Sequence, residues 1–336
     1  MLLHIVHRHL HLGIQLLLYA YYFVKPAIPQ SARFTLRHCY STPLKWLFAS
    51  SWPIDPSSGD APSGWPGWPQ GKRFAVALSH DVEGVKGLAR CRALAELETR
   101  HGFRSAFYFI PEGEYATPDE LRHFLDTNGF EVGVHDLHHD GTLYRSHRGF
   151  KHAAARINHY LKAWKAVGFR SGFMRHDLQW LGDLDVAYDA STFDYDPFEP
   201  QPDGMHTIFP FWVRRQDGSA YVELPYTLAQ DSTVFLILRE KGNDVWKRKL
   251  DWVAARGGMA FVIVHPDYMA FDAPRASEYR AALYEEFLEY VNQQYRDTAW
   301  FALPRDIAQH IRQHLPLPGA MSAPADAGET GPGRTK

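Results

Sequence analysis

Between Phe74 and His314, short apolar runs alternate with longer stretches in which apolar residues recur every three or four positions. Strand-like runs such as "FAVALS", "FEVGV" and "MAFVIV" each stand next to a helical pattern, of which "VKGLARCRALAELETR" is the clearest. Short continuous apolar runs are typical of buried strands, and the wider spacing is typical of amphipathic helices. Repeated strand and helix units of this size predict a mostly parallel sheet. With about seven strands, the pattern favours a closed or nearly closed barrel over an open sheet.

The hydrophobic pattern also divides the chain into four parts. Residues 1–54 form a basic, apolar N-terminal arm, 55–73 a linker rich in proline, glycine and tryptophan, 74–315 the barrel, and 316–336 a tail expected to be disordered because it has almost no large apolar residue. Three Trp-Pro pairs, at Trp52 just before the linker and at Trp65 and Trp68 within it, are expected to pin the arm to the barrel. Within the barrel, "TPDELRHFLDTNG" predicts a helix with Thr117 as its N-cap.

The N-terminal arm contains no acidic residue and carries five basic ones, Arg8, Lys25, Arg33, Arg37 and Lys45. Its apolar stretch Ile14–Val24 has 11 residues, whereas a membrane span needs about 20. No clear signal-peptide cleavage site follows it. We therefore expect a segment that either packs on the barrel or lies at a membrane surface, attracted to anionic lipid. The expected location is cytoplasmic or peripheral at the membrane.

Composition narrows the function. The 336 residues carry a formal net charge of -2, with 22% charged residues, so nothing indicates a nucleic-acid partner. The two cysteines, Cys39 and Cys91, form no CxxC pair, which argues against a thiolate zinc site. Four histidines near the N-terminus have no accompanying carboxylate and are interpreted as part of a polar arm.

Ionisable residues follow four of the predicted strands. "FAVALS" is followed by His80, Asp81 and Glu83, "FEVGV" by "HDLHHDG", "GF" by Arg170, and "MAFVIV" by His265. Active sites of α/β barrels are assembled at this end of the strands, from residues that different strands contribute. Any one of these residues would be unremarkable alone, but four strands together predict a site.

Two histidines in "HDLHHDG" suggest a metal. His135 and His139 are four positions apart, which would place both imidazoles on one face if the segment were helical. A carboxylate from a neighbouring strand would complete a set of two histidines and one carboxylate, with open positions for water and substrate. Asp81 and Glu83 are the candidates. One carboxylate cannot easily be both a tight ligand and a free base, because a bound cation lowers its basicity.

Five motifs, "ALSHDVE", "EVGVHDLHHDG", "GFRSG", "YDASTFDYD" and "VIVHPDYM", in this order and at these separations, resemble those of the NodB-type polysaccharide deacetylases, carbohydrate esterase family four and its relatives. The resemblance covers about Phe74 to Asp267. It implies a distorted (β/α) barrel, a divalent metal held by an acid and two histidines, an aspartate base, an arginine that orients the base, and a histidine acid on a late strand. The implied reaction is hydrolysis of an N-acetyl group from a sugar.

The resemblance assigns a role to each residue that matches a motif. It implies that Asp81 is the base, that Arg170 orients it and that His265 is the acid. It also implies that His135 and His139 bind the metal, with zinc expected first and cobalt, nickel or iron as alternatives. Its fourth motif and the residues after His265 offer four acids that could support that histidine, Asp189, Asp194, Asp196 and Asp267, without a choice between them.

The first and third motifs depart from the family pattern. Val82 stands where the metal-binding aspartate is usual, and a subgroup with Asp-Val-Asp suggests that Glu83 is the ligand instead, with Asp81 as the alternative ligand. Gly172 replaces a common proline, which predicts a looser loop. The expected partner is an N-acetylated carbohydrate. Two alternatives remain: an amidase that acts on a small cyclic amide, and a glycan-binding barrel without catalysis.

Overall fold

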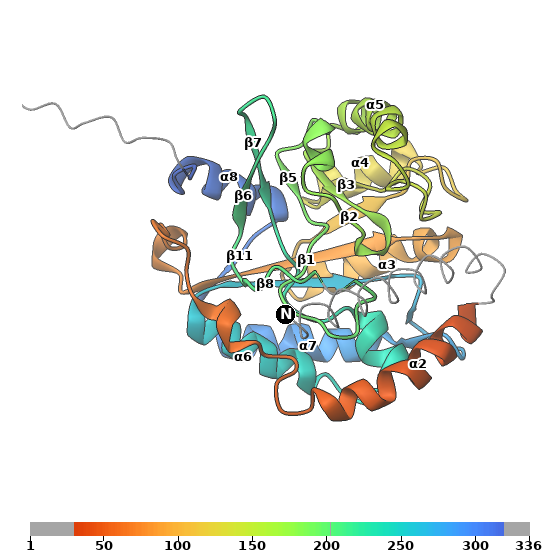
Figure 1. Ribbon diagram of the computed structural model, residues 1–336. Coiled ribbons are helices and arrows are strands. Elements are labelled where there is room, and N and C mark those ends of the chain that lie inside the picture. Colours follow the sequence, from red (N-terminus) through yellow and green to blue (C-terminus); the bar gives the residue numbers. More distant parts are fainter. Residues whose placement is uncertain (1–29, 202, 319–336) are drawn as a thin grey trace, which may run out of the picture.

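The computed structural model describes residues 30–201 and 203–318 (Figure 1). Its α-helices are α2 Gln30–Leu47, α3 Val85–Arg100, α4 Asp119–Thr127, α5 His147–Trp164, α6 Asp244–Arg256, α7 Ala281–Tyr295 and α8 Pro304–His314. Its strands are β1 Phe74–Val82, β2 Ala106–Phe109, β3 Glu131–His135, β4 Gly168–Arg170, β5 Tyr188–Asp189, β6 Phe211–Arg214, β7 Ala220–Glu223, β8 Met259–Val264, β9 Met269–Ala270, β10 Tyr279–Arg280 and β11 Ala299–Phe301.

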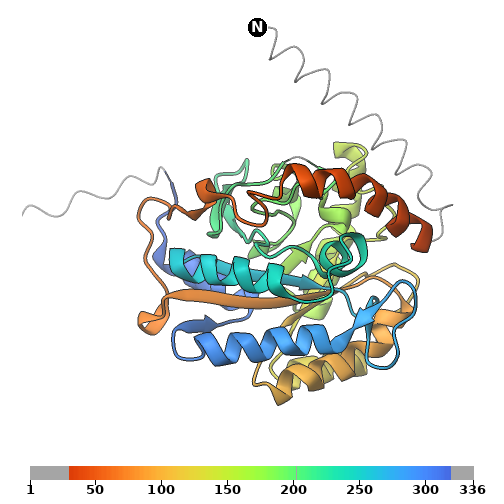
Figure 2. The same ribbon diagram turned by 90° about the horizontal axis from the view of Figure 1, so that it is seen from below.

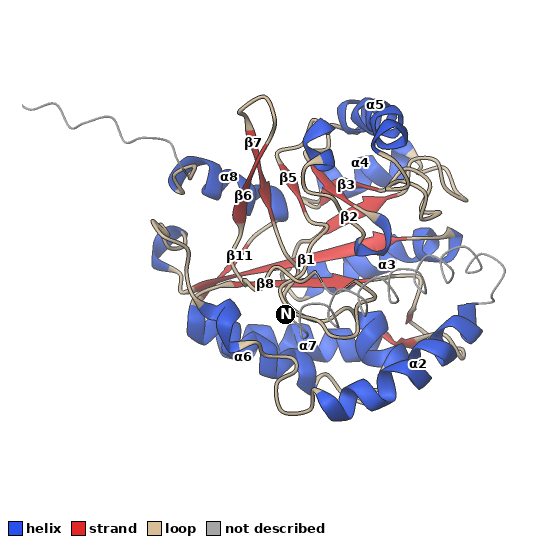
Figure 3. Ribbon diagram, viewed as in Figure 1, coloured by secondary structure: helices blue, strands red, loops and turns tan. Residues whose placement is uncertain are grey.

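The main sheet has nine strands in the described part of the chain, and all of its pairs are parallel except β6 with β7. The central strand is β1, which pairs with β8 along one edge. Along the other edge its first half pairs with β11 and its second half with β2. From β2 the sheet continues through β3, β4 and β5 to β7. The helices lie outside the curved sheet (Figure 3).

Two isolated bridges bring the far edges of the sheet together. Phe193, after β5, pairs with Tyr226, and Leu228 pairs with Val262 of β8. The segment that follows β7 therefore connects the β5 side to β8 and completes a ring of seven strand positions. This confirms the predicted distorted barrel of about seven strands, to which β6 and β11 are added at the edges.

Alternation along β1 separates the two cores. All nine residues of the strand are buried, and successive side chains point to opposite faces. Ala75 and Ala77 pack in the barrel interior with Tyr108, whereas Phe74 and Val76 pack in the cluster between the sheet and the helices. By the same alternation Asp81 points into the barrel mouth and His80 points outward.

Most helix positions agree with the sequence pattern. Helix α3 has the predicted bounds, and its buried residues include Cys91, Leu94 and Leu97. Helix α4 differs at its start, because Pro118 occupies the N-cap position and makes no side-chain cap bond. The prediction of Thr117 as N-cap was therefore wrong by one residue.

The N-terminal helix α2 lies along the outside of the molecule (Figure 2) and packs on the barrel. The side chain of Arg37 donates to the Phe198 carbonyl at 3.1 Å, and the His38 ring lies 2.7 Å from the Ile237 carbonyl. Just before the linker, Trp52 packs edge-on against Phe198. The parts of the predicted arm and tail in residues 1–29 and 319–336 lie outside the described residues. None of the helices in the described ranges is long and apolar enough to span a bilayer.

Candidate active site

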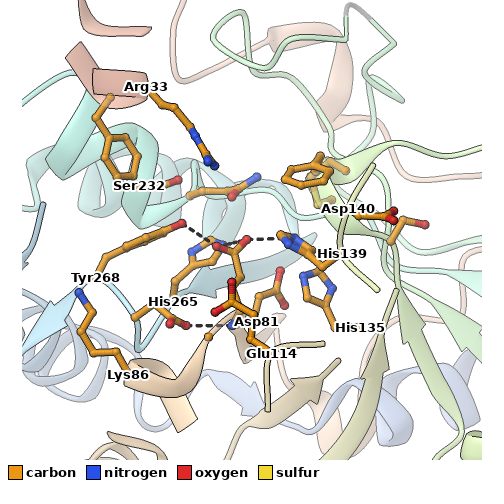
Figure 4. A pocket seen from close by; sticks show the side chains of 18 of the residues that line it. Arg33, Asp81, Lys86, Glu114, His135, His139, Asp140, Ser232, His265 and Tyr268 are labelled. Atoms are coloured by element: carbon orange, nitrogen blue, oxygen red, sulfur yellow. Dashed lines mark hydrogen bonds and ion pairs between the residues drawn. The ribbon is translucent and has the colours of Figure 1, made fainter. Parts of the chain in front are cut away.

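An open pocket of about 730 Å³ lies at the carboxyl ends of the strands and under the first turns of α2. Ends of four strands, β1, β3, β4 and β8, contribute to its lining. Seen from close by, His135 and His139 approach from one side and His265 from the other, with Asp81 between them (Figure 4). The pocket thus brings together residues predicted from three strands, namely Asp81 and Glu83, His135 and His139, and His265. Arg170, predicted from the fourth strand, is buried behind the pocket and contacts Asp81. The lining residues include Arg33, Phe34, Arg37, Asp81, Glu83, Lys86, Glu114, His135, His139, Asp140, Ser171, Phe173, Glu199, Gln230, Ser232, His265, Asp267 and Tyr268.

Glu83, His135 and His139 form a compact group of donor atoms. One atom from each lies within 4.8 Å of the other two, and His139 Nε2 is 3.2 Å from Glu83 Oε1. The segment that carries the histidines is not a helix, because Asp136 and His139 have positive φ angles of 56° and 55°. The two imidazoles meet through this sharp bend and not through helical spacing.

The three residues fit a divalent cation. His135 Nδ1 lies 3.1 Å from the Arg170 carbonyl, so its proton is placed there and Nε2 faces the group. His135 Nε2 is buried without a hydrogen-bond partner, which is unusual for a buried polar atom, and His139 Nε2 has the Glu83 carboxylate 3.2 Å away. Burial lowers the pKa of His135, and a neutral imidazole is the form that binds metal. Two imidazoles and a carboxylate are a common zinc set.

Glu83 is held from two directions. Tyr268 donates its hydroxyl to Glu83 Oε2 at 2.6 Å, and the Glu83 backbone amide donates to Asp267 Oδ2 at 2.9 Å. Burial would raise the pKa of the Glu83 carboxyl, but His139, the charge of His265 and the hydrogen bond from Tyr268 hold it well below its usual range. The carboxylate is therefore ionised and fixed in place.

Asp81 is paired with the buried Arg170. Arg170 Nη1 donates to Asp81 Oδ1 at 2.7 Å and to Ser79 Oγ at 2.9 Å, and Arg170 Nε donates to the Ala190 carbonyl. Burial would raise the pKa of Asp81, but the charge of Arg170, followed by that of His135, keeps it below the ordinary value. This geometry places Arg170 where an orienting arginine would act.

The His265 ring hydrogen-bonds to Asp231, which no sequence pattern singled out. His265 Nδ1 lies 2.6 Å from Asp231 Oδ1, and the His265 backbone amide donates to Asp231 Oδ2 at 2.8 Å. The Tyr279 hydroxyl donates to the same carboxylate at 2.9 Å. Burial would lower the pKa of His265, but Asp231 raises it to about 10. The imidazole is therefore protonated at neutral pH.

The four acids considered as partners of His265 have other roles. Asp194 Oδ2 accepts from Lys249 at 2.5 Å, and Asp189 accepts from Ser191. Asp196 accepts from the Phe198 amide, and Asp267 from the amides of residues 83 and 87. Asp231 lies at the start of the short π-helix Ser232–Ile237 and accepts the Ser232 amide. An acid before an apolar helix is a recognisable cap signal, but its sequence position does not reveal the contact with His265.

Two other histidines near the motifs lie away from the candidate metal group. His80 Nε2 contacts Glu98 Oε1 at 2.8 Å, and Glu98 also accepts from Tyr284 and Ser105. His80 therefore belongs to the packing between β1 and the helices. His138 Nδ1 lies 3.0 Å from the Glu112 carbonyl on the exposed side of its loop.

Gly172 is closely packed, contrary to the looser loop expected in place of proline. It lies in the short 3₁₀ turn Gly172–Met174 and is buried. A Cβ atom added there would lie 2.5 Å from Asp136 Oδ2 and 2.7 Å from His139 Cδ2. Glycine thus leaves the space that the His139 ring occupies.

No sequence pattern indicated the part that α2 plays at this site. Arg33, Phe34 and Arg37 line the pocket, and Phe34 packs edge-on against Tyr268 with ring centroids 5.4 Å apart. The arm was expected to pack on the barrel or on a membrane, and neither expectation placed it over the strand ends. The pattern of residues 30–47 is compatible with a helix but does not predict its contact with the pocket.

The sequence matches no protein-family model and no curated protein. The fold is similar to that of a proposed polysaccharide deacetylase from Mycobacterium smegmatis, with a TM-score of 0.59, 19% identity, and coverage of 79% of this chain and 99% of that one. A peptidoglycan deacetylase from Bacillus subtilis gives a TM-score of 0.41 at 13% identity, over 73% of this chain and 94% of that one. A carbohydrate esterase family four pseudoenzyme from Bacillus anthracis gives a TM-score of 0.43 at 14% identity, over 72% of this chain and 66% of that one. The similarity to the Mycobacterium smegmatis structure shows that the chain has the polysaccharide deacetylase fold.

Proposed function

We propose that this protein is a metal-dependent hydrolase that removes the acetyl group from an N-acetylated sugar of a polysaccharide or envelope glycan. The observation that carries the proposal is the position of the Glu83, His135 and His139 group between two charged pairs in one pocket. Asp81 with Arg170 supplies a fixed anionic carboxylate, and His265 with Asp231 supplies a cationic imidazole. A base, an acid and a cation-binding group are the parts that amide hydrolysis needs.

Asp81 is assigned the role of base. It is ionised because Arg170 stabilises its charge, and Arg170 binds one of its two oxygens. We assign the other oxygen to accept the proton of the water that attacks the acetyl carbonyl. Arg170 is in turn held by the barrel interior, where its guanidinium lies over the Tyr108 ring at 4.4 Å. This support keeps the carboxylate in a single orientation.

His265 is assigned the role of acid. Its Nδ1 is bound to Asp231, so Nε2 is the atom that donates a proton to the departing amine. The raised pKa keeps this proton in place at neutral pH before the reaction. A general acid in such a position contributes roughly 10²- to 10⁴-fold to the rate. Asp231 acts through the histidine and is a positioning residue.

Glu83, His135 and His139 are the residues that would hold the metal. A divalent cation bound there supplies Lewis-acid polarisation of the acetyl carbonyl. Zinc suits two imidazoles and a carboxylate, and cobalt, nickel and iron accept the same donors. Because Arg170 engages Asp81 and the donor group includes Glu83, Glu83 is favoured over Asp81 as the carboxylate ligand.

The pocket favours a sugar over a small cyclic amide. An amidase for a small ring would require a narrow, closed site, whereas this pocket is open and extends from the strand ends to α2. Acetate release from N-acetylated oligosaccharides, compared with hydrolysis of cyclic amides, separates the two activities. A protein that takes up no metal and releases no acetate after addition of zinc, cobalt, nickel or iron would instead be a non-catalytic glycan-binding barrel.

Paired variants test the assigned roles. Asp81→Asn should retain zinc but lose at least about 10²-fold in kcat, because it removes only the base. Glu83→Gln should weaken zinc binding itself, because it removes a charged ligand. The exposed Asp185→Asn is a matched control for loss of one negative charge. Zinc content and acetate release are measured for each. An empty site in Asp81→Asn together with a filled one in Glu83→Gln would reverse the two roles.

A further inference from the structure

Helix α2 exposes an apolar stripe that the barrel does not cover. Seven large apolar side chains are exposed in the described part of the chain, and four of them belong to this one helix: Leu36 at 54%, Tyr40 at 65%, Trp46 at 83% and Leu47 at 70%. Leu36, Tyr40 and Leu47 are separated by four and seven positions, which places them on one side of the helix. Trp46 extends the stripe at its C-terminal end.

The opposite side of α2 is the side that contacts the barrel. Phe34 packs on Tyr268, His38 contacts the Ile237 carbonyl, and Ser41 is buried. The stripe is therefore separate from the side of the helix that packs on the barrel. It is a second apolar face on a helix whose first face already has its partners, and exposed apolar groups of this kind mark interaction sites.

Basic residues lie near the C-terminal end of the stripe, and no acidic residue lies on its helix. The first acidic residue of the sequence is Asp55, so no carboxylate side chain lies on α2 or precedes it. Lys45 pairs with Glu240, and that glutamate lies between the exposed Arg239 and Lys241. An apolar face with tryptophan and tyrosine, bordered by cations and free of acids on its own helix, has the composition of a helix that lies in the surface of an anionic bilayer.

The neighbouring sequence continues the same chemistry. Five residues separate the apolar stretch Ile14–Val24 from the start of α2 at Gln30, and the first of them is Lys25. Association of a second copy through the stripe would place the same cations of both copies close together, because a two-fold contact joins identical surfaces. Like charges across an interface disfavour association. An anionic surface is the occupant that both the apolar and the charged features favour.

We propose that the exposed face of α2 binds the surface of an anionic lipid bilayer, with Leu36, Tyr40, Trp46 and Leu47 inserted at the level of the headgroups. This inference does not depend on the proposed deacetylase activity. If both hold, the active-site pocket lies beside the membrane, because Arg33, Phe34 and Arg37 on the other face of the helix line it. A glycan carried at the membrane would then reach the strand ends without leaving the surface.

Vesicle sedimentation of the full-length chain tests the proposal. Wild-type protein should bind vesicles of phosphatidylcholine with phosphatidylglycerol, bind pure phosphatidylcholine vesicles much more weakly, and be released by salt. Trp46→Gln/Leu47→Gln should weaken binding at least about tenfold, because two of the most exposed apolar side chains no longer enter the lipid. Glutamine is a good helix former, so α2 is retained. Val167→Gln/Phe271→Gln, which removes two other exposed apolar side chains, should bind as wild type.

Other occupants of the apolar stripe would give different results. If the stripe instead joins two copies, the wild type elutes as a dimer that the Trp46→Gln/Leu47→Gln variant loses. If it is covered by residues 14–24 of the same chain, the variant has a lower melting temperature and vesicle binding is absent. Equal binding of the wild type and the variant to anionic vesicles would also overturn the proposal. Acetate release in solution is measured in parallel, so failure of the lipid proposal is distinguishable from failure of the enzymatic one.

Discussion

Replacement of Gly172 by alanine tests the candidate metal site through its packing and leaves every proposed ligand in place. The glycine has no positive φ, so alanine can adopt its backbone conformation. The added Cβ would lie 2.7 Å from His139 Cδ2 and 2.5 Å from Asp136 Oδ2. Real Cβ atoms do not approach other heavy atoms closer than 3.0 Å. Either the imidazole or the turn must therefore move.

The size of this movement follows from the contacts. The His139 ring must retreat by about 0.3 Å to reach 3.0 Å, and by about 0.7 Å to reach an unstrained 3.4 Å. It is also packed against Phe173, with ring centroids 4.3 Å apart, and against His135 at 4.9 Å. Metal–ligand distances tolerate only about 0.2 Å. We therefore expect zinc affinity to fall by about 10- to 100-fold, as for loss of a group that orients a ligand.

Isothermal titration calorimetry of chelator-treated protein with zinc measures this change directly. Gly242→Ala is the matched control, because a Cβ there would have no neighbour closer than 4.0 Å and the residue has no positive φ. Thermal unfolding of both apo variants checks that the fold is retained. Wild-type zinc affinity in a folded Gly172→Ala protein would show that His139 is not held against this glycine, and the packing argument would be wrong.

Three further predictions concern other groups. Burial and a neighbouring carboxylate raise the pKa of Asp196 to about 8, so between about pH 4 and pH 8 the folded chain keeps a proton that the unfolded chain loses, and the free energy of unfolding falls as pH rises. In urea unfolding, the stability of Asp196→Asn relative to wild type should therefore be greater at pH 8 than at pH 4. An equal difference at both pH values would contradict this prediction. His80→Ala should lower the free energy of unfolding by about 3 kcal/mol, because Glu98 loses a buried partner. Zinc affinity should be unchanged, and a weaker zinc affinity in a folded variant would place His80 in the site. Tyr268→Phe removes the 2.6 Å hydrogen bond to Glu83 and should weaken zinc binding about tenfold with little change in melting temperature. An unchanged zinc affinity in calorimetry would show that Tyr268 does not orient Glu83 for metal binding.

The barrel was predictable because its strands and helices have complete apolar patterns. Strand β8 and helix α3 have the predicted bounds, since each pattern is uninterrupted and ends at polar residues. The β6 and β7 hairpin was missed, although Asp217 and Gly218 lie at its turn between two strands of alternating pattern. Local patterns therefore located the parallel strands well and the edge of the sheet less well.

The site was predictable only where strand order determines position. Asp81, Arg170 and His265 come together because parallel strands end at the same edge of a barrel. His135 and His139 also meet, but through positive φ angles that no helical spacing describes. Contacts between loops depend on how the loops are placed in three dimensions. The chain therefore gives no local sign that Asp231, 34 residues before His265, is the residue that binds its ring.

The three sheet partners of β1 imply that the two halves of the site differ in how easily they open. The amides of β1 pair with β8 on one edge and with β2 and β11 on the other, so hydrogen exchange around Asp81 should require unfolding of the whole barrel. His139 lies in a loop beyond β3, and loops of this kind open in smaller units. Mild denaturant should therefore disrupt the metal-binding arrangement while the Asp81 and Arg170 pair persists. The protein would then lose bound metal before it loses its fold, and it would regain the metal without refolding the barrel.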